Sequence, residues 1–194
     1  TWITRNGACN YQDWIDPSDK DPNQFVYNSS VSKGMTPLLE RIWPQISSQV
    51  PQAKLKVIGG YYRFRSDDPP DEQEQKWHKL YAEHHGKQGV EFTGIITQKE
   101  IAEILAKSSL MLYPSSFPET FGISALESLN ALTPLVTNRF GALEEIAIDL
   151  ACYKLDYAIE PNGLFPGINM DQQVDRFVDL ALRAHGNKYL LKQK

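Results

Sequence analysis

Cysteine is scarce in this chain of 194 residues, which contains only Cys9 and Cys152. Neither belongs to a C-x-x-C pair, and no histidine is spaced to complete a zinc site, so we predict a structural or free thiol at each. No stretch approaches the ~20 consecutive apolar residues that cross a bilayer. No charged segment followed by an apolar one opens the chain, so we expect no secretory signal. Because the first residue is Thr1 rather than Met, we expect this chain to be part of a longer protein.

An excess of basic charge is also missing. The chain has 20 Lys and Arg against 24 Asp and Glu, which gives a formal net charge of −4. Electrostatic capture of DNA or RNA needs clustered basic residues, so we predict no nucleic-acid partner. Hydrophobic residues make up 41% and charged residues 23% of the chain, as in an ordinary globular protein with one core.

Two glycine-rich nucleotide motifs are absent. The sequence has no G-x-x-x-x-G-K-[ST] loop, which excludes a P-loop triphosphatase. It also has no G-x-G-x-x-G motif, which disfavours a dinucleotide oxidoreductase.

Strand-like and helical segments alternate along the chain. Short apolar runs typical of strands lie at 25–27, 55–58, 90–92, 110–113 and 135–137. Helices are predicted over 35–46, 71–85, 97–105, 121–132, 142–147 and 174–182. This alternation predicts an α/β fold, a Rossmann-like parallel sheet with helices on both faces. We expect residues 1–24 to be a polar, turn-rich leading segment and residues 25–194 to be the folded domain.

Two of the predicted helices carry local signals. Pro44 is expected to kink or shorten the end of helix 35–46, because proline has no N–H and its ring clashes with the preceding turn. Thr97 and Glu100 have the spacing of a capping box, which predicts the start of the helix that follows.

Functional residues are expected where strands lead into helices. In an open parallel sheet, ligands lie outside the carboxyl ends of the strands, where helix N-termini suit phosphate. The turn over 28–34 combines Ser29, Ser30 and Lys33 with a glycine, and such a turn could cradle a phosphate. The alternative is that its serines and glycine are ordinary loop and cap residues and that Lys33 is solvated.

A second turn carries acidic residues. Glu119 lies at the start of a predicted helix, where a carboxylate is often only a favourable partner of the helix dipole. Glu127 lies within the apolar stretch of that helix, where burial of a carboxylate costs free energy unless it has a partner. Two further turns are also candidates. The turn over 138–145 has a glycine before a short helix, and Gly94-Ile95-Ile96 could offer backbone groups to a nucleotide base.

These segments resemble motifs of a known family. Residues 118–122 with Glu127 resemble the E-x7-E motif of retaining GT-B glycosyltransferases, the glycosyltransferase group 1 family that includes glycogen and sucrose synthases. Residues 33–39 resemble that family's K-G-x-x-x-L-L helix start, and 90–94 resemble its V-x-F-x-G. The resemblance covers nearly the whole chain and implies the C-terminal, donor-binding half of a GT-B fold, without the N-terminal acceptor domain.

The resemblance also implies roles for individual residues. Glu119 would be catalytic and contact the donor sugar, Glu127 would accept hydrogen bonds from the ribose hydroxyls, and Lys33 would neutralise the diphosphate. The other donor-binding positions that it implies are Ser29, Ser30, Gly94, Ile95, Thr120, Phe121, Gly122 and Ile123. Many members of the family have an arginine where this chain has Asn28.

The reaction implied by the resemblance is transfer of a sugar from a UDP-, GDP- or ADP-sugar to a glycan, lipid or other acceptor. Anomeric configuration would be retained, and no metal or other cofactor is expected. We expect a cytoplasmic enzyme of polysaccharide biosynthesis and little or no transfer by this chain alone, and we leave peripheral membrane association of the longer protein open. Two alternatives stay open: a non-catalytic interaction module with the same fold, and a nucleotide-sugar epimerase.

The helix predicted over 71–85 offers weaker candidates. His84 and His85 would point about 100° apart on a helix, which is unsuitable for one metal ion. We therefore expect them at the surface. Trp77 and Tyr81 are four residues apart and are expected to form the packing stripe of that helix rather than a sugar platform.

Overall fold

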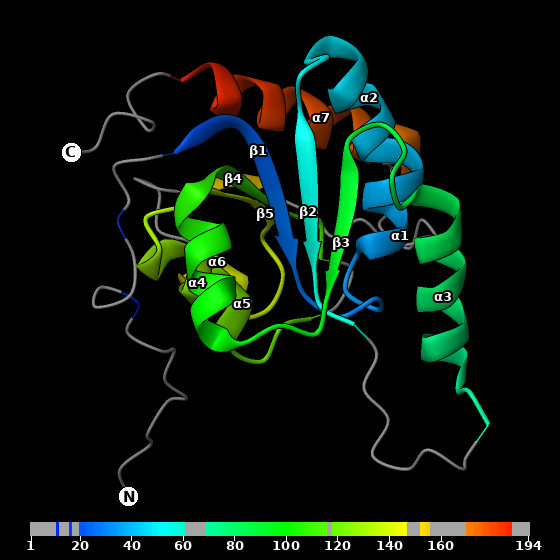
Figure 1. Ribbon diagram of the computed structural model, residues 1–194. Coiled ribbons are helices and arrows are strands. Elements are labelled where there is room, and N and C mark those ends of the chain that lie inside the picture. Colours follow the sequence, from blue (N-terminus) through cyan, green and yellow to red (C-terminus); the bar gives the residue numbers. More distant parts are fainter. Residues whose placement is uncertain are drawn as a thin grey trace, which may run out of the picture.

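A six-stranded parallel sheet forms the centre of the molecule (Figure 1). The computed structural model describes residues 11, 16, 20–60, 69–115, 118–146, 152–155 and 170–187. The strands are β1 (Asp21–Asn28), β2 (Lys54–Ile58), β3 (Val90–Gly94), β4 (Ser108–Tyr113), β5 (Leu135–Asn138) and β6 (Cys152–Leu155). Their order across the sheet is β3-β2-β1-β4-β5-β6, and every neighbouring pair is parallel. The predicted Rossmann-like architecture is confirmed.

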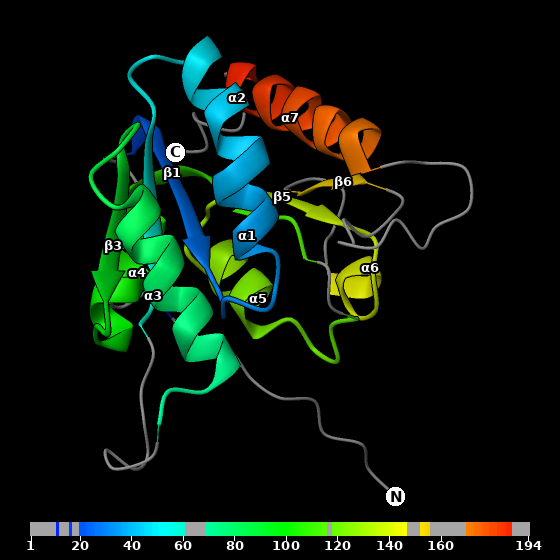
Figure 2. The same ribbon diagram turned by 90° about the vertical axis from the view of Figure 1, so that its right-hand side faces the viewer.

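Helices cover both faces of the sheet (Figures 1 and 2). One face carries α1 (Met35–Pro37), the π-helical segment η1 (Leu38–Ile42), α2 (Trp43–Gln49), α3 (Glu72–His84) and α7 (Met170–Gly186). The other face carries α4 (Gln98–Lys107) and α5 (Ile123–Asn130), and the short α6 (Leu143–Ile146) packs beside α5 and β5. None of these described helices has the length and apolar character needed to cross a membrane.

The core lies around the two central strands. Phe25 of β1 and Met111 of β4 are completely buried, as expected for strands covered on both faces. The helical segment that follows β1 adds buried side chains at the predicted periodic positions, and the Trp43 ring packs edge-on against Phe25 at 5.6 Å. The Thr97–Glu100 capping box at the start of α4 is also confirmed, with both reciprocal hydrogen bonds present.

Pro44 does not end the helix after β1. Of the two outcomes predicted for Pro44, a kinked or a shortened helix, the shortened helix is wrong, because the helix continues to Gln49. A π-helical segment over Leu38–Ile42 comes first, and Pro44 then occupies the first turn of α2. A π turn changes the hydrogen-bond register locally, which accommodates a residue without an N–H. The proline therefore marks a change of helix type.

Two strands differ from the sequence prediction. β1 begins at Asp21, before the apolar run, and Asp21 is in register with Ser108 of β4. β6 was not predicted, because its four residues, Cys152–Leu155, show no period-two pattern. It extends the sheet beyond β5, with Leu135 opposite Cys152. Cys152 is a buried free thiol, as predicted, whereas Cys9 lies outside the described residues.

Candidate functional site

The strand order fixes where a crevice forms. β1 pairs with β2 on one side and with β4 on the other. The connections that leave β1 and β4 go to helices on opposite faces, so a crevice opens between them at the carboxyl edge of the sheet. This edge faces down in Figure 1, where the strand arrows point. Asn28 ends β1 and Tyr113 ends β4, so both lie at the crevice.

Lys33 and Glu119 form an ion pair across this crevice. The ammonium nitrogen of Lys33 lies 2.9 Å from each carboxylate oxygen of Glu119. The Glu119 side chain is 3% exposed and that of Lys33 is 29% exposed, so the cation reaches solvent while the carboxylate does not. The hydroxyl of Tyr113 donates a hydrogen bond to Oε1 of Glu119. Two predicted site residues from distant turns therefore lie together.

Two buried tyrosines hold the turn after β1 in place. The Tyr27 hydroxyl shares its one hydrogen between the carbonyl oxygens of Ser30, at 2.8 Å, and Lys33, at 3.1 Å. Ser29 Oγ donates to the Tyr113 hydroxyl at 3.4 Å. Burial raises the pKa of both phenols, and the hydrogen bond to Glu119 raises the pKa of Tyr113 further. Both hydroxyls therefore remain protonated at neutral pH and can donate hydrogen bonds.

Glu127 is buried inside α5 and has a partner on β1. It is 7% exposed, and its Oε2 accepts a hydrogen bond of 3.0 Å from Nδ2 of Asn28. This contact offsets part of the cost of removing a carboxylate from water. The sequence predicted that Glu127 needs a partner, and the structure identifies that partner as Asn28.

Two glycines allow the loops around Glu119 to approach closely. Gly34 has a φ of 98°, and a Cβ at this position would lie 1.9 Å from the carbonyl oxygen of Pro114. Gly141 has a φ of 61° and forms a single β-bridge with Glu119. The Ala142 amide then donates to the Glu119 carbonyl at 2.7 Å. The turn after β5 thus fixes the backbone of Glu119.

The start of α5 lies in the same loop as Glu119. Gly122 is the N-cap residue of α5, with a φ of 73° and no side chain to cap the helix. Of the predicted positions here, Thr120 is exposed, Phe121 is half-buried and Ile123 is 43% exposed. The first amide groups of a helix without a side-chain cap are available to an anion.

A pocket of about 390 Å³ opens at the same edge of the sheet. It combines the hydroxyl-rich turn after β1 with apolar side chains from β2, α4 and the turn after β3. Its lining residues are Asn28, Ser29, Ser30, Ile58, Gly59, Gly60, Ile95, Ile96 and Ile101. Gly94, with a φ of 70°, ends β3 next to this pocket. The first and fourth turns predicted from the sequence therefore meet in one pocket.

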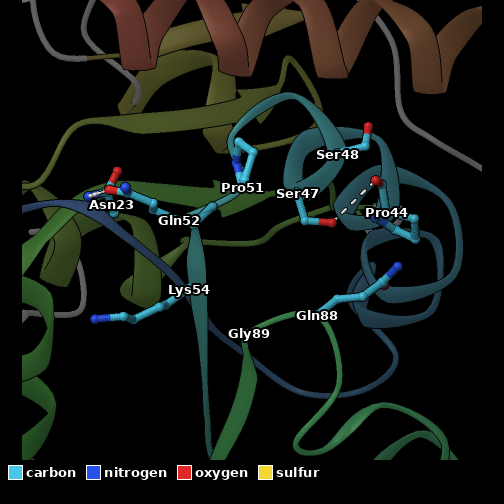
Figure 3. Close-up of a pocket in the computed structure, with 10 residues that line it drawn as sticks. Asn23, Pro44, Ser47, Ser48, Pro51, Gln52, Lys54, Gln88 and Gly89 are labelled. Carbon is cyan, nitrogen blue, oxygen red and sulfur yellow. Dashed lines mark hydrogen bonds between the residues drawn. The ribbon is translucent and has the colours of Figure 1, made fainter.

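A larger pocket of about 710 Å³ lies at the opposite edge of the sheet (Figure 3). It is formed by the end of α2, the turn before β2 and the turn before β3, and its lining includes Pro51, Lys54 and Gln88. None of the predicted site residues lines it. Because ligands of open parallel sheets bind at the carboxyl ends of the strands, this pocket is not the candidate site.

The aromatic residues of α3 pack against the sheet and one another. Trp77 stacks on Tyr81 at 5.3 Å and contacts Phe92 of β3 edge-on at 5.9 Å, which confirms the predicted packing stripe. His85 is exposed but accepts a hydrogen bond of 3.1 Å from the Phe92 amide through Nδ1, so it also has a structural contact. No group of three or more potential metal ligands occurs among the described residues.

Sequence reasoning missed the tyrosines of the site. Tyr27 and Tyr113 end runs of buried strand residues, so they resembled ordinary core residues. The available signal was a phenol at the carboxyl end of each central strand, because a buried hydroxyl needs a hydrogen-bond partner. Asn28 carried a similar signal, as a polar residue that ends an apolar strand.

Comparison with solved structures shows a shared fold. The GtfA/B complex superposes with a TM-score of 0.63 at 16% identity, over 89% of this chain and 31% of that chain. Anabaena Alr3699/HepE, solved with UDP-glucose, superposes with a TM-score of 0.56 at 16% identity, over 87% of this chain and 41% of that chain. Sucrose-phosphate synthase from Thermosynechococcus elongatus superposes with a TM-score of 0.59 at 19% identity, over 94% of this chain and 41% of that chain. The chain thus spans less than half of each of these proteins, and at these low identities the likeness shows a shared fold.

Sequence comparison identifies the family. A GDP-mannose-dependent alpha-(1-6)-phosphatidylinositol dimannoside mannosyltransferase of Mycobacterium tuberculosis is 45% identical over 58 residues, which are 29% of this chain and 15% of that protein. The family model described as "Glycosyl transferases group 1" matches residues 13–163, which is most of the chain. This chain belongs to the group 1 family of glycosyltransferases.

Proposed function

We propose that this chain binds the nucleotide-diphosphate-sugar donor of a retaining glycosyltransferase, whose sugar passes to a glycan or lipid acceptor. The observation that carries the proposal is the Lys33–Glu119 pair at the crevice between β1 and β4. It places a partly exposed cation and a buried carboxylate next to the uncapped start of α5. A diphosphate linked to a sugar needs these groups: positive charge for the phosphates and a hydrogen-bond acceptor for the sugar hydroxyls.

The nucleoside has a place in the same proposal. In the pocket of about 390 Å³, Ile58, Ile95 and Ile96 offer an apolar surface for a flat base. Asn28 lines this pocket and also contacts Glu127, so a ribose at the polar end would lie near the Glu127 carboxylate. The family relative is GDP-mannose-dependent and the HepE structure holds UDP-glucose, which supports a nucleotide sugar as the donor. Which base this chain binds is a question for measurement.

The proposed chemistry needs charge stabilisation at the leaving group. As the bond from the anomeric carbon to the diphosphate oxygen breaks, negative charge grows on the departing nucleotide. Lys33 and the first amides of α5 would stabilise this charge, and fixed donors in a water-poor crevice do so more strongly than water does. Glu119, held by Lys33 and Tyr113, would keep the sugar in place. In this proposal the positive charge that stabilises the leaving group comes from the protein, and no metal is needed.

Acceptor binding belongs to parts of the protein beyond this chain in our proposal. The chain spans less than half the length of its structural relatives, so we propose that it binds the donor without transferring sugar efficiently. Donor binding and sugar transfer are then separable properties.

Isothermal titration calorimetry of this chain with UDP, GDP and ADP tests the proposal. We expect one of these nucleotides to bind and Glu127→Ala to weaken that binding by at least about tenfold, since a charged hydrogen bond is lost. Glu103→Ala, which changes an exposed glutamate of α4, is the matched control and should leave binding unchanged. Circular dichroism confirms that each variant is folded. Absence of binding at millimolar nucleotide, or equal binding by Glu127→Ala and wild type, would overturn the proposal.

A further inference from the structure

We propose that Asn28 is a positioning residue of the nucleotide site. Its side-chain amide holds one oxygen of the Glu127 carboxylate and directs the other oxygen to the ligand. This inference rests on the proposed function, in which Glu127 binds the nucleotide.

The contact joins two rigid elements across the crevice. Asn28 is the last residue of β1, in register with Ile58 of β2, and Glu127 lies within α5. Both side chains are buried, at 8% and 7% exposure. Asn28 Nδ2 lies 3.0 Å from Oε2 of Glu127, and in the described part of the chain Oε1 has no such partner. Among the described residues, the Asn28 amide is therefore the group that orients the carboxylate.

A neutral donor suits this role better than a cation would. Arginine can bind both oxygens of a carboxylate at once, which would occupy one lone pair on each oxygen and neutralise the charge. The asparagine amide is neutral and makes a single-point contact, so it does not itself neutralise the charge of Glu127. A carboxylate held in this way keeps its full capacity to accept hydrogen bonds from ligand hydroxyls.

The position of Asn28 also connects this contact to the ligand pocket. Asn28 lines the pocket of about 390 Å³ together with Ser29 and Ile95. A nucleoside in that pocket would therefore lie beside the residue that orients Glu127. Loss of the amide should turn the Glu127 side chain toward water, because a buried carboxylate without a partner is costly.

Two substitutions of Asn28 test the inference on the full 194-residue chain, with the nucleotide that wild type binds. Asn28→Ala should weaken binding roughly tenfold, as expected for loss of a hydrogen bond to a charged group. Asn28→Asp keeps the shape but puts two carboxylates in contact, so they must share a proton. The affinity of Asn28→Asp relative to wild type at the same pH should be low near pH 8 and recover toward about pH 5. Taking this ratio removes the contribution of the ligand, whose terminal phosphate itself titrates at about pH 6.

Controls separate positioning from a structural role. Asn23→Ala changes an asparagine at the other end of β1 and should leave the affinity unchanged. The double variant Asn28→Asp with Glu127→Gln restores a donor–acceptor pair with only one carboxylate. Its thermal stability should therefore recover, and the pH profile of its binding should match that of wild type. A merely structural role for Asn28 would change the melting temperature without changing the pH profile of binding.

The two proposals fail in different ways. If wild type binds no nucleotide, both the proposed function and the role of Asn28 are wrong. Suppose instead that wild type binds nucleotide and Glu127→Ala does not. If Asn28→Ala then binds as well as wild type, or if Asn28→Asp shows the wild-type pH profile, only the role of Asn28 is overturned.

Discussion

The ammonium group of Lys33 lies 2.9 Å from the Glu119 carboxylate, although 86 positions separate the two residues in the sequence. The connections after β1 and β4 bring them together at the point where the direction of the strand order changes. Because Glu119 is buried and Lys33 is partly exposed, the pair holds a cation at the surface of the crevice.

Removal of the Lys33 charge should weaken binding of a nucleoside diphosphate but not of the nucleoside. We expect Lys33→Met to raise the dissociation constant for the nucleoside diphosphate by about tenfold or more, because a charge-assisted hydrogen bond is lost. Binding of the corresponding nucleoside, measured by the same calorimetry, should be unaffected. Lys99→Met changes an exposed lysine of α4 and is the charge-matched control. An equal loss for nucleoside and diphosphate would contradict a phosphate contact at Lys33.

Removal of the Tyr113 hydroxyl should affect the sugar part of the donor. Tyr113→Phe leaves Glu119 with Lys33 as its remaining partner among the contacts described above. We expect the affinity for the nucleotide sugar to fall by about threefold to tenfold, as for one hydrogen bond, while the nucleotide without sugar binds as before. Tyr81→Phe, at a 38% exposed position on α3, is the control. The role assigned to Tyr113 is wrong if both ligands lose affinity equally.

Gly34→Ala should destabilise the whole chain. The φ of 98° is costly for alanine, and the new methyl group would overlap the Pro114 carbonyl oxygen at 1.9 Å. We expect the free energy of unfolding to fall by at least about 2 kcal/mol, measured by urea denaturation. Gly186→Ala is the matched control, because its Cβ would have no neighbour within 4 Å, and it should not destabilise the chain. A change of similar size in both variants would contradict a specific need for glycine at Gly34.

Lys20 should make stability depend on alkaline pH. Burial lowers its pKa from 10.5 to about 8, and its ammonium group donates to the Ser108 carbonyl at 3.0 Å and to Thr133 Oγ1 at 3.1 Å. Between pH 8 and 10.5 the unfolded chain therefore binds more protons at this residue than the folded chain does. The free energy of unfolding should rise with pH in this window, with a slope of at most the value expected for one proton.

Comparison with a variant isolates this effect. Lys20→Met should lose the pH-dependent contribution of Lys20 to the free energy of unfolding. The difference in this free energy between Lys20→Met and wild type should therefore change between pH 7.5 and 9.5. Lys76→Met, at an exposed position of α3, should show a constant difference. A constant difference for Lys20→Met as well would show that burial does not lower its pKa.

The fold could be predicted because its central strands are covered on both faces. Such strands are nearly continuous apolar runs, and β1 and β4 are visible in the sequence for that reason. β6 lies at the edge of the sheet, and its residues Cys152–Leu155 carry no comparable pattern. The π-helical segment before Pro44 was also unpredictable, because periodicity does not distinguish a proline that ends a helix from one that changes its type.

The site could be predicted as a set of turns but not as a set of contacts. The rule that ligands lie at the carboxyl ends of parallel strands located Lys33, Glu119 and Glu127 at one edge. It did not show that Asn28 holds Glu127, because this contact depends on side-chain directions across a distance of 99 residues in the sequence. Tyr113 was missed because a tyrosine that ends an apolar strand resembles a core residue.

The position of the crevice between β1 and β4 links ligand binding to folding. Asn28 ends one central strand and Lys33 follows it, whereas Glu119 and Glu127 follow the other central strand. The site therefore does not exist until these two strands are paired. A ligand that bridges the crevice binds the folded chain and not the unfolded one, and its binding free energy adds to the stability of the entire sheet. Occupancy of this site would therefore report that the centre of the molecule has assembled.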